Sequence, residues 1–141
     1  MNDYNKYAFR IRSAMQKTQR EIAAKMLTQY KTKLTRVQFY LLQLIADEEP
    51  CKVTDIAKRF GANPSTVSTV VTRLVHEKLI TREYGNNDRR NVFVSITPLG
   101  KEVLEEDLRN YSQVLEHYLS RLEPDELEAF ILTFEKLASV K

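Results

Sequence analysis

The sequence contains one cysteine, three glycines, four prolines and no tryptophan among its 141 residues. A single thiol, Cys51, excludes an intrachain disulfide and a multi-cysteine zinc site. No stretch approaches the roughly 18 uninterrupted apolar residues of a membrane span, and the N-terminus lacks the basic-then-apolar layout of a signal peptide. A phosphate-binding glycine loop, a nucleophile–base pair and a catalytic carboxylate pair are also missing. These absences predict a cytoplasmic protein that is not an enzyme and uses no cofactor or metal.

The whole chain is 43% apolar and 29% charged, which indicates a globular protein of one domain. Charge is unevenly distributed. Lys and Arg outnumber Asp and Glu by 9 to 5 in residues 1–50 and by 8 to 4 in residues 51–100, whereas acids lead by 10 to 5 in residues 101–141. A basic body with an acidic tail suits a polyanionic partner. Solvated helix faces explain the acidic third equally well, so charge alone decides little.

Apolar spacing predicts long amphipathic helices at both ends of the chain. One runs over residues 5–30. A second begins after Thr97-Pro98 and carries the stripe Leu104, Leu108, Tyr111, Leu115, Leu119 and Leu122. A third follows Pro124, with Leu127, Phe130, Ile131, Phe134 and Leu137 on its apolar face. Because these stripes exceed what a small core consumes, we expect a homodimer in which they meet a second copy. A monomeric helical bundle is the alternative.

The middle of the chain predicts a helix-turn-helix followed by a hairpin. Thr35 and Gln38 form a capping box at the start of a central buried helix. Thr54 can cap a short helix, Asp55–Phe60, that Gly61 stops because it can take a positive φ. Asn63-Pro64 opens a helix lasting to about Lys78. Residues 79–84 and 91–96 then read as two strands.

The helix pair has apolar or small residues at positions that would pack it together, namely Ala57, Val67 and Val70. The second helix leaves a polar, largely uncharged face of Ser65, Thr66, Ser68, Thr69, Thr72 and Arg73. Solvated helices usually display Lys and Glu, which form helices better than Ser and Thr. Short hydroxyl side chains allow a helix to sit deep in the major groove of DNA. Helix capping explains Ser65 and Thr66 but not all five hydroxyls.

The hairpin loop carries Asp88, Arg89 and Arg90. Arginines at a loop tip contribute little to packing, but they suit the narrow, electronegative minor groove. Asp88 is compatible with that role if it orients an arginine through a charge-assisted hydrogen bond. The two motifs together predict a protein that contacts duplex DNA at two places.

Over essentially its whole length the chain resembles the MarR family of bacterial winged helix-turn-helix transcriptional regulators. The most specific match is the wing, Asp88–Gly100; Ser65–Ser68 with Arg73-Leu74 matches the recognition helix, and Leu34-Thr35 with Gln38-Phe39 the start of an earlier helix. Lys78, where the family often has glycine, and Thr69, where many relatives have arginine, depart from the pattern. At Lys78 a left-handed cap would be costly, so the helix is expected to end differently.

The resemblance implies a mostly α fold with a small β-hairpin wing. A winged helix-turn-helix core over 35–97 would comprise the helix-turn-helix at 53–78 and the wing at 79–97. Dimerisation helices at 5–30 and 98–141 would flank this core. It also implies a homodimeric repressor on a pseudo-palindromic operator, with Asp88 and Arg90 as the wing pair.

In this family helices enclose a pocket between the dimerisation and DNA-binding parts, where phenolic or lipophilic effectors bind in several relatives. Tyr7, Tyr30, Tyr40 and Tyr111, with Tyr118, are candidates for such a pocket, and ordinary core tyrosines are the alternative. Two other functions stay open. One is a thiol redox switch at Cys51, whose thiolate the neighbouring Lys52 would favour; a structurally inert thiol is the alternative there. The other is a winged-helix protein-interaction module that does not read DNA sequence.

Overall fold

The computed structural model describes residues 3–87 and 90–139 and divides the chain into two compact units. One unit comprises the chain up to Tyr30 together with the segment from Asn110 onward. The other is Lys31–Arg109. The predicted winged core, 35–97, falls within this second unit. Within the described ranges, no helix has the length and apolarity needed to cross a membrane.

The first unit is built from α1 (Asp3–Tyr30), the second half of α5 (Pro98–Leu119) and α6 (Pro124–Ala138). The helix expected over 5–30 is confirmed. A small core joins α1 to α5, with Ile22, Met26 and Val114 buried and Tyr30, Tyr111, Leu115 and Tyr118 packed around them. The hydroxyl of Tyr30 donates to Gln113 Oε1 at 2.7 Å. The predicted stripe omitted Val114, and its last member, Leu122, lies beyond the end of α5.

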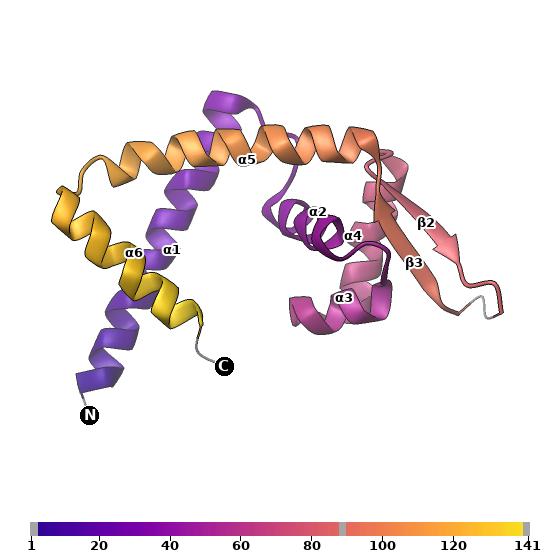
Figure 1. The fold of residues 1–141 in the computed structure, drawn as a ribbon, viewed down its shortest axis with the longest axis horizontal. Helices are drawn as coiled ribbons and strands as arrows, with labels where there is room; N and C mark the ends of the chain where they lie inside the picture. Colours follow the sequence, from indigo (N-terminus) through magenta and orange to yellow (C-terminus); the bar gives the residue numbers. More distant parts are fainter. Residues whose placement is uncertain (1–2, 88–89, 140–141) are drawn as a thin grey trace. The chain divides into compact units, whose positions relative to one another are not determined.

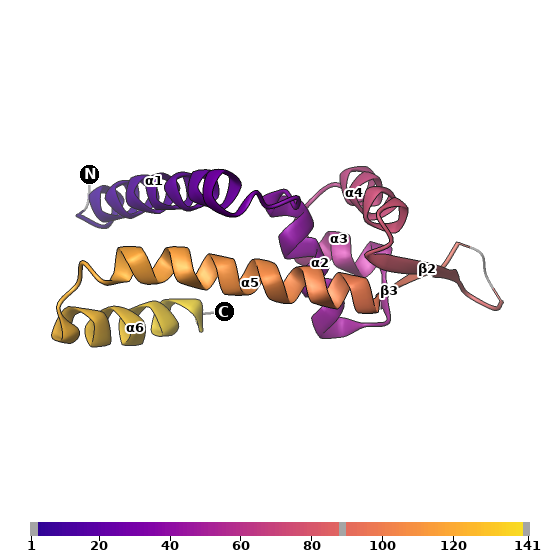
Figure 2. The same cartoon turned by 90° about the horizontal axis from the view of Figure 1, so that it is seen from above.

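The chain reverses direction between α5 and α6 (Figure 2). Glu123 caps α6 in a capping box with Glu126, and Pro124 occupies the first helical turn, as Pro98 does in α5. The predicted apolar face of α6 stays largely exposed in the single chain, with Phe130 50%, Phe134 48% and Leu137 61% accessible. An isolated copy therefore leaves an apolar helix face without a partner among the described residues.

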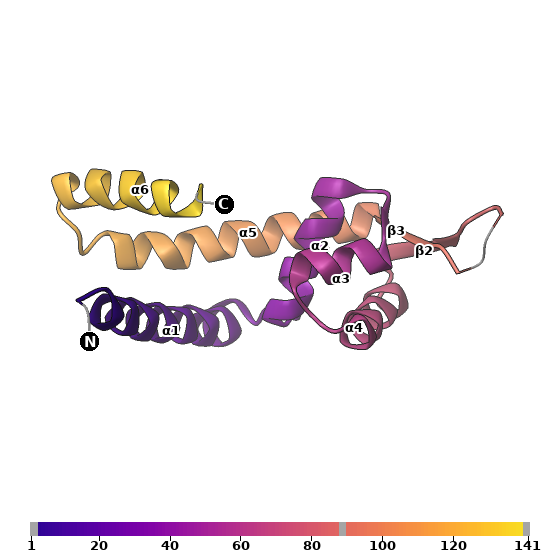
Figure 3. The ribbon, with the colours of Figure 1, turned by 90° about the horizontal axis from the view of Figure 1, so that it is seen from below.

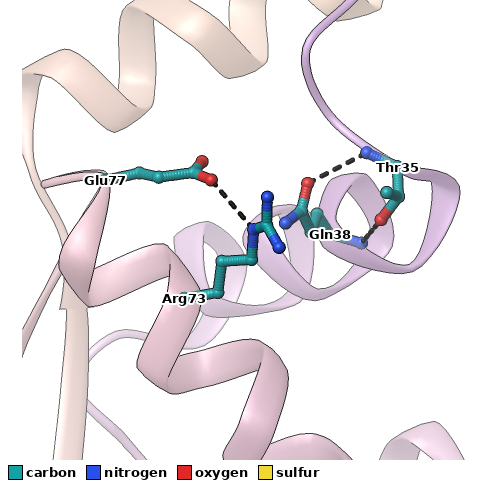
Figure 4. Close-up of polar contacts among 4 residues, drawn as sticks. All are labelled: Thr35, Gln38, Arg73 and Glu77. Atoms are coloured by element: carbon teal, nitrogen blue, oxygen red, sulfur yellow. Dashed lines mark hydrogen bonds and ion pairs between the residues drawn. The ribbon is translucent and has the colours of Figure 1, made fainter.

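In the second unit, α2 (Arg36–Glu48) begins at the predicted capping box. The Gln38 backbone N–H donates to the Thr35 hydroxyl at 3.1 Å, and the Thr35 N–H donates to Gln38 Oε1 at 3.0 Å (Figure 4). Leu41, Leu42 and Ile45 are fully buried, so α2 is the central helix of this unit. The remaining core residues are contributed by every other element of the unit.

The helix α3 (Val53–Phe60) starts earlier than the sequence pattern suggested. Thr54 does not cap it; the N-cap is Lys52, without a side-chain hydrogen bond. The reason is a short strand, β1 (Cys51–Lys52), which holds Lys52 extended immediately before the helix. Gly61 ends α3 at φ 66°, the left-handed conformation expected of it.

The helix α4 (Pro64–His76) ends two residues before the predicted Lys78. Lys78 then adopts φ 64°, while the Leu79 N–H donates to the Leu74 carbonyl and the Lys78 N–H to the Val75 carbonyl. This is the Schellman arrangement that usually takes glycine. The expectation that a non-glycine here would end the helix differently is wrong, because Lys78 accepts the left-handed conformation.

The strands β2 (Ile80–Tyr84) and β3 (Val92–Ile96) form the predicted hairpin, with Leu79 and Asn91 outside the strands. The antiparallel sheet has the order β1-β3-β2. Tyr84 pairs with Val92 and Ile80 with Ile96, and β1 adds to the other edge through Cys51 and Val94. Figures 1 and 3 show β2 and β3 extending away from α2 and α3 as a two-stranded arm. The predicted fold class, mostly helical with a hairpin wing, is confirmed.

Candidate DNA-binding surface

One face of α4 is anchored in the core of the second unit, which fixes the face that remains outside. Val67, Val71 and Leu74 are buried there. At the start of the helix, Asn63 Oδ1 accepts from the Ser65 N–H at 2.9 Å, the N-cap predicted from the Asn63-Pro64 pair. Burial of this stripe leaves the opposite side of α4 exposed, and all six predicted contact residues lie there: Ser65, Thr66, Ser68, Thr69, Thr72 and Arg73.

Three of these hydroxyls already donate hydrogen bonds within the helix. Thr69 Oγ1 donates to the Ser65 carbonyl at 3.0 Å and Thr72 Oγ1 to the Ser68 carbonyl at 2.9 Å. Ser65 Oγ donates to Asn63 Oδ1 at 2.8 Å. Side chains bonded to the preceding turn are held close to the helix, so the exposed face of α4 is short and polar. That shape lets a helix approach base edges closely.

Arg73 is the cation on this face. Its Nε lies 3.2 Å from Glu77 Oε1 (Figure 4), and its side chain is 72% exposed. An exposed pair one helical turn apart stabilises a helix by only about 0.3–0.5 kcal/mol. Arg73 can therefore exchange this partner for a phosphate at little cost.

The wing, defined as β2, β3 and the loop between them, is closed by a backbone hydrogen bond from the Gly85 N–H to the Asn91 carbonyl at 2.8 Å. Arg90 is exposed beside this closure. Asp88 and Arg89 lie outside the described residues, so the predicted contact between Asp88 and an arginine stays a prediction.

The sequence interpretation missed Arg82, on β2. Its Nη2 donates to the hydroxyl of Thr72 at 2.9 Å and so connects the wing to α4. Side chains alternate between the two faces of a strand, so Arg82 is expected on the same face as the apolar Ile80 and opposite Thr81 and Glu83. This was the one signal for Arg82 in the sequence.

The tyrosines fall in both units. Tyr7, 53% exposed, and the half-buried Tyr30 and Tyr111 belong to the first unit, and Tyr40, 39% exposed, belongs to the second. In the first unit two cations lie over the Tyr118 ring, Lys25 Nζ and the Arg121 guanidinium, both 5.1 Å from its centroid. A role in packing α1 and α5 accounts for Tyr118 without any ligand.

Cys51 is a buried thiol. Burial raises its pKa above the ordinary thiol value, and the nearby carboxylates of Asp55 and Glu49 raise it further. The neighbouring Lys52 does not overcome these effects. A protonated, buried sulfur reacts slowly with oxidants, so the structure does not support the redox alternative.

Comparison with known proteins adds the family. The MarR family model matches residues 34–92. The transcriptional repressor MdtR of Bacillus subtilis is 31% identical over 117 residues, which cover 83% of this chain and 74% of the repressor. The crystal structure of YusO from Bacillus subtilis is 28% identical, covers 99% of this chain and 100% of that one, and superposes with a TM-score of 0.73.

A second structure, BpsR of Bordetella bronchiseptica, is described as having its DNA binding regulated by 6-hydroxynicotinic acid. It is 26% identical, covers 92% of this chain and 99% of that one, and has a TM-score of 0.73. Together with the hydroxyl-lined face of α4 and the wing beside it, these matches identify the chain as a member of the MarR family of transcriptional regulators.

Proposed function

We propose that this chain is a repressor that binds a pseudo-palindromic operator as a homodimer. Each α4 enters a major groove and each wing the adjacent minor groove, with half-sites about one helical turn apart. The observation that carries the proposal is the exposed face of α4, where six contact-competent polar side chains lie opposite a fully buried stripe. The similarity to a repressor supports the direction of regulation.

The exposed apolar faces of the first unit support the homodimer. Apolar side chains are exposed along α1 and α6, among them Tyr4, Phe9, Phe130, Phe134 and Leu137. Monomeric proteins rarely leave so many large apolar groups in water along two helices. A second copy related by two-fold symmetry would cover these faces and set the distance between the two α4 helices.

Release by a small aromatic acid or phenol completes the proposal. The regulation of BpsR by a hydroxylated aromatic acid supports this ligand class. Tyr7, Tyr30 and Tyr111 in the first unit, and Tyr40 in the second, are the proposed contacts. An effector that binds better to one arrangement of the dimer shifts its equilibrium and thereby changes operator affinity.

The decisive experiment is selection and sequencing of genomic fragments bound by the purified protein, with and without phenolic ligands. We expect a palindromic motif and a steep decrease of affinity with salt. A bound set without any shared motif would instead support a protein-interaction module.

Substitution of the wing arginine tests the DNA contact itself. Arg90→Ala should weaken operator binding by about 1–3 kcal/mol in a fluorescence anisotropy titration. Lys136→Ala, which removes the same charge from α6, is the matched control and should bind nearly as the native protein does. Full operator affinity of the Arg90 variant would remove the wing from the mechanism.

A further inference from the structure

Arg82 joins the wing to α4 through two consecutive hydrogen bonds. Its Nη2 donates to Thr72 Oγ1 at 2.9 Å, and the same hydroxyl donates to the Ser68 carbonyl at 2.9 Å. The side chain of a wing strand is thereby connected to the backbone of the helix that carries the DNA-contacting face. The two elements are also joined by the tight turn at Lys78 and by the shared core, to which Leu74 and Ile80 contribute.

The surroundings of Arg82 are unusual for an arginine on a two-stranded arm. It is partly buried, opposite the buried Val94, while its neighbours Thr81 and Glu83 are exposed. Its Nε is buried without a hydrogen-bond acceptor among the described residues. A buried guanidinium N–H without an acceptor costs folding free energy. Side chains kept at such a cost are candidates for a function other than stability.

We propose that Arg82 is a positioning residue that fixes the wing relative to α4, so that both meet the DNA in one arrangement. This inference rests on the proposed function. A direct phosphate contact fits less well, because Nη2 is already bonded to Thr72 and Nε is buried. Lysine would not be equivalent, since a single ammonium lacks the planar, multi-donor fork of the guanidinium.

The test is a double-mutant cycle with Arg82→Met, which keeps the apolar stem, and Thr72→Val, which keeps the shape and removes the hydroxyl. Arg82→Met should weaken binding to the selected operator by about tenfold, the loss of one hydrogen bond to a charged group, and Thr72→Val, which also removes a hydroxyl of the proposed DNA-contacting face, by at least as much. The double variant should be no weaker than Thr72→Val alone. In a Thr72→Ser background, which retains the hydroxyl, Arg82→Met should again cost about tenfold.

Two readouts separate positioning from its rivals. The salt dependence of binding should be unchanged in Arg82→Met, whereas loss of a phosphate contact would lower the slope by about one. The loss of operator affinity caused by Arg90→Ala should be smaller in the Arg82→Met background, because a wing that is not held against α4 contributes less to DNA binding. Additive effects of residues 72 and 82, or a reduced salt slope, would overturn the proposal.

Hydrogen exchange of the DNA-free protein tests whether Arg82 links the wing to α4 without requiring DNA binding. Arg82→Met should increase amide exchange in both α4 and β2–β3, and Thr72→Val should do the same. Unchanged exchange in both variants would overturn the link between the elements. Failure of the native protein to bind any DNA would overturn the proposed function alone, and the exchange result would still test the link.

Discussion

Gly100 lies so close to Leu79 that a Cβ on the glycine would stand 2.1 Å from the Leu79 carbonyl oxygen. The same oxygen accepts from the Thr97 N–H at 3.0 Å, and the Thr97 hydroxyl lies 2.7 Å from the Lys78 carbonyl oxygen and 3.0 Å from that of Leu79. The first turn of α5 is therefore attached to the residue that precedes β2. The attachment needs a residue without a side chain at position 100.

Gly100→Ala should destabilise the fold by about 2–3 kcal/mol, because backbone atoms rather than a flexible side chain would have to move. Urea unfolding at a fixed protomer concentration measures the effect. Gly61→Ala is the control: its φ is also unfavourable for alanine, at 66°, but a Cβ there meets nothing within 4 Å. Its cost should be about 1 kcal/mol. Equal costs at the two positions would contradict the steric argument.

Lys78→Gly should stabilise the protein, since Lys78 pays for a left-handed φ of 64° that glycine adopts freely. The gain should be about 1 kcal/mol, or an increase of about 3 °C in Tm. The same substitution at the exposed Lys101, inside α5, should lower stability by about 1 kcal/mol. A decrease in Tm for Lys78→Gly would mean that the lysine makes contacts that outweigh its backbone strain.

Asp107 should make stability depend on pH. Burial raises the pKa of this carboxyl, an effect that the hydrogen bond donated by Thr32 only partly opposes. The folded state therefore holds the proton more tightly than the unfolded chain, and stability is lost as pH rises from the unfolded pKa through the folded one.

Asp107→Asn retains an acceptor for Thr32 and removes the buried charge. Its Tm should exceed that of the native protein at pH 7, and the difference should shrink as the pH falls toward about 4. Glu105→Gln, an exposed neighbour on α5, should show little change at either pH. A variant less stable than native at pH 7 would show that the ionised carboxylate is stabilising.

Phe134→Lys should convert the dimer to a monomer. Phe130 and Phe134 stack at 5.5 Å between ring centroids while both stay about half exposed, and a charge there would be buried by a second copy. Sedimentation equilibrium should report the monomer mass, and operator affinity should fall by more than about tenfold because only one half-site is engaged. Glu128→Lys, on the same helix but off the apolar face, should remain dimeric. A dimeric Phe134 variant would place the interface elsewhere.

The helix caps that could be predicted from the sequence depend on residues two or three positions apart. The Thr35–Gln38 capping box and the Asn63 cap formed as expected because each needs only its own turn of helix. The strand β1 was missed because its two residues pair with Phe93 and Val94, about 40 positions away. That pairing also moved the start of α3 from the predicted Thr54 cap to Val53.

In the candidate site, too, features set by neighbouring residues could be predicted and features set by packing between elements could not. Exposure of the α4 hydroxyls could be predicted from the apolar stripe opposite them. The bond between Arg82 and Thr72 could not, because it depends on how β2 packs beside α4 after the turn at Lys78. Local pattern identifies the face that is exposed, and packing decides which of its groups remain available.

On the proposed function, the hydrogen bonds within α4 restrict which base groups this helix can recognise. Thr69 and Thr72 each give their only hydroxyl hydrogen to a carbonyl one turn earlier, so neither hydroxyl has a hydrogen left for a base, and Thr72 Oγ1 also accepts from Arg82. In the major groove, adenine and cytosine present amino hydrogens and thymine a methyl group, whereas guanine presents only acceptors. Without a hydroxyl hydrogen to offer, Thr69 is thus suited to the amino hydrogens of adenine and cytosine and to the methyl group of thymine, whereas the Thr72 hydroxyl is engaged by Arg82. Any guanine read by this helix must be recognised by a donor elsewhere on it, and Arg73 is the cation on that face.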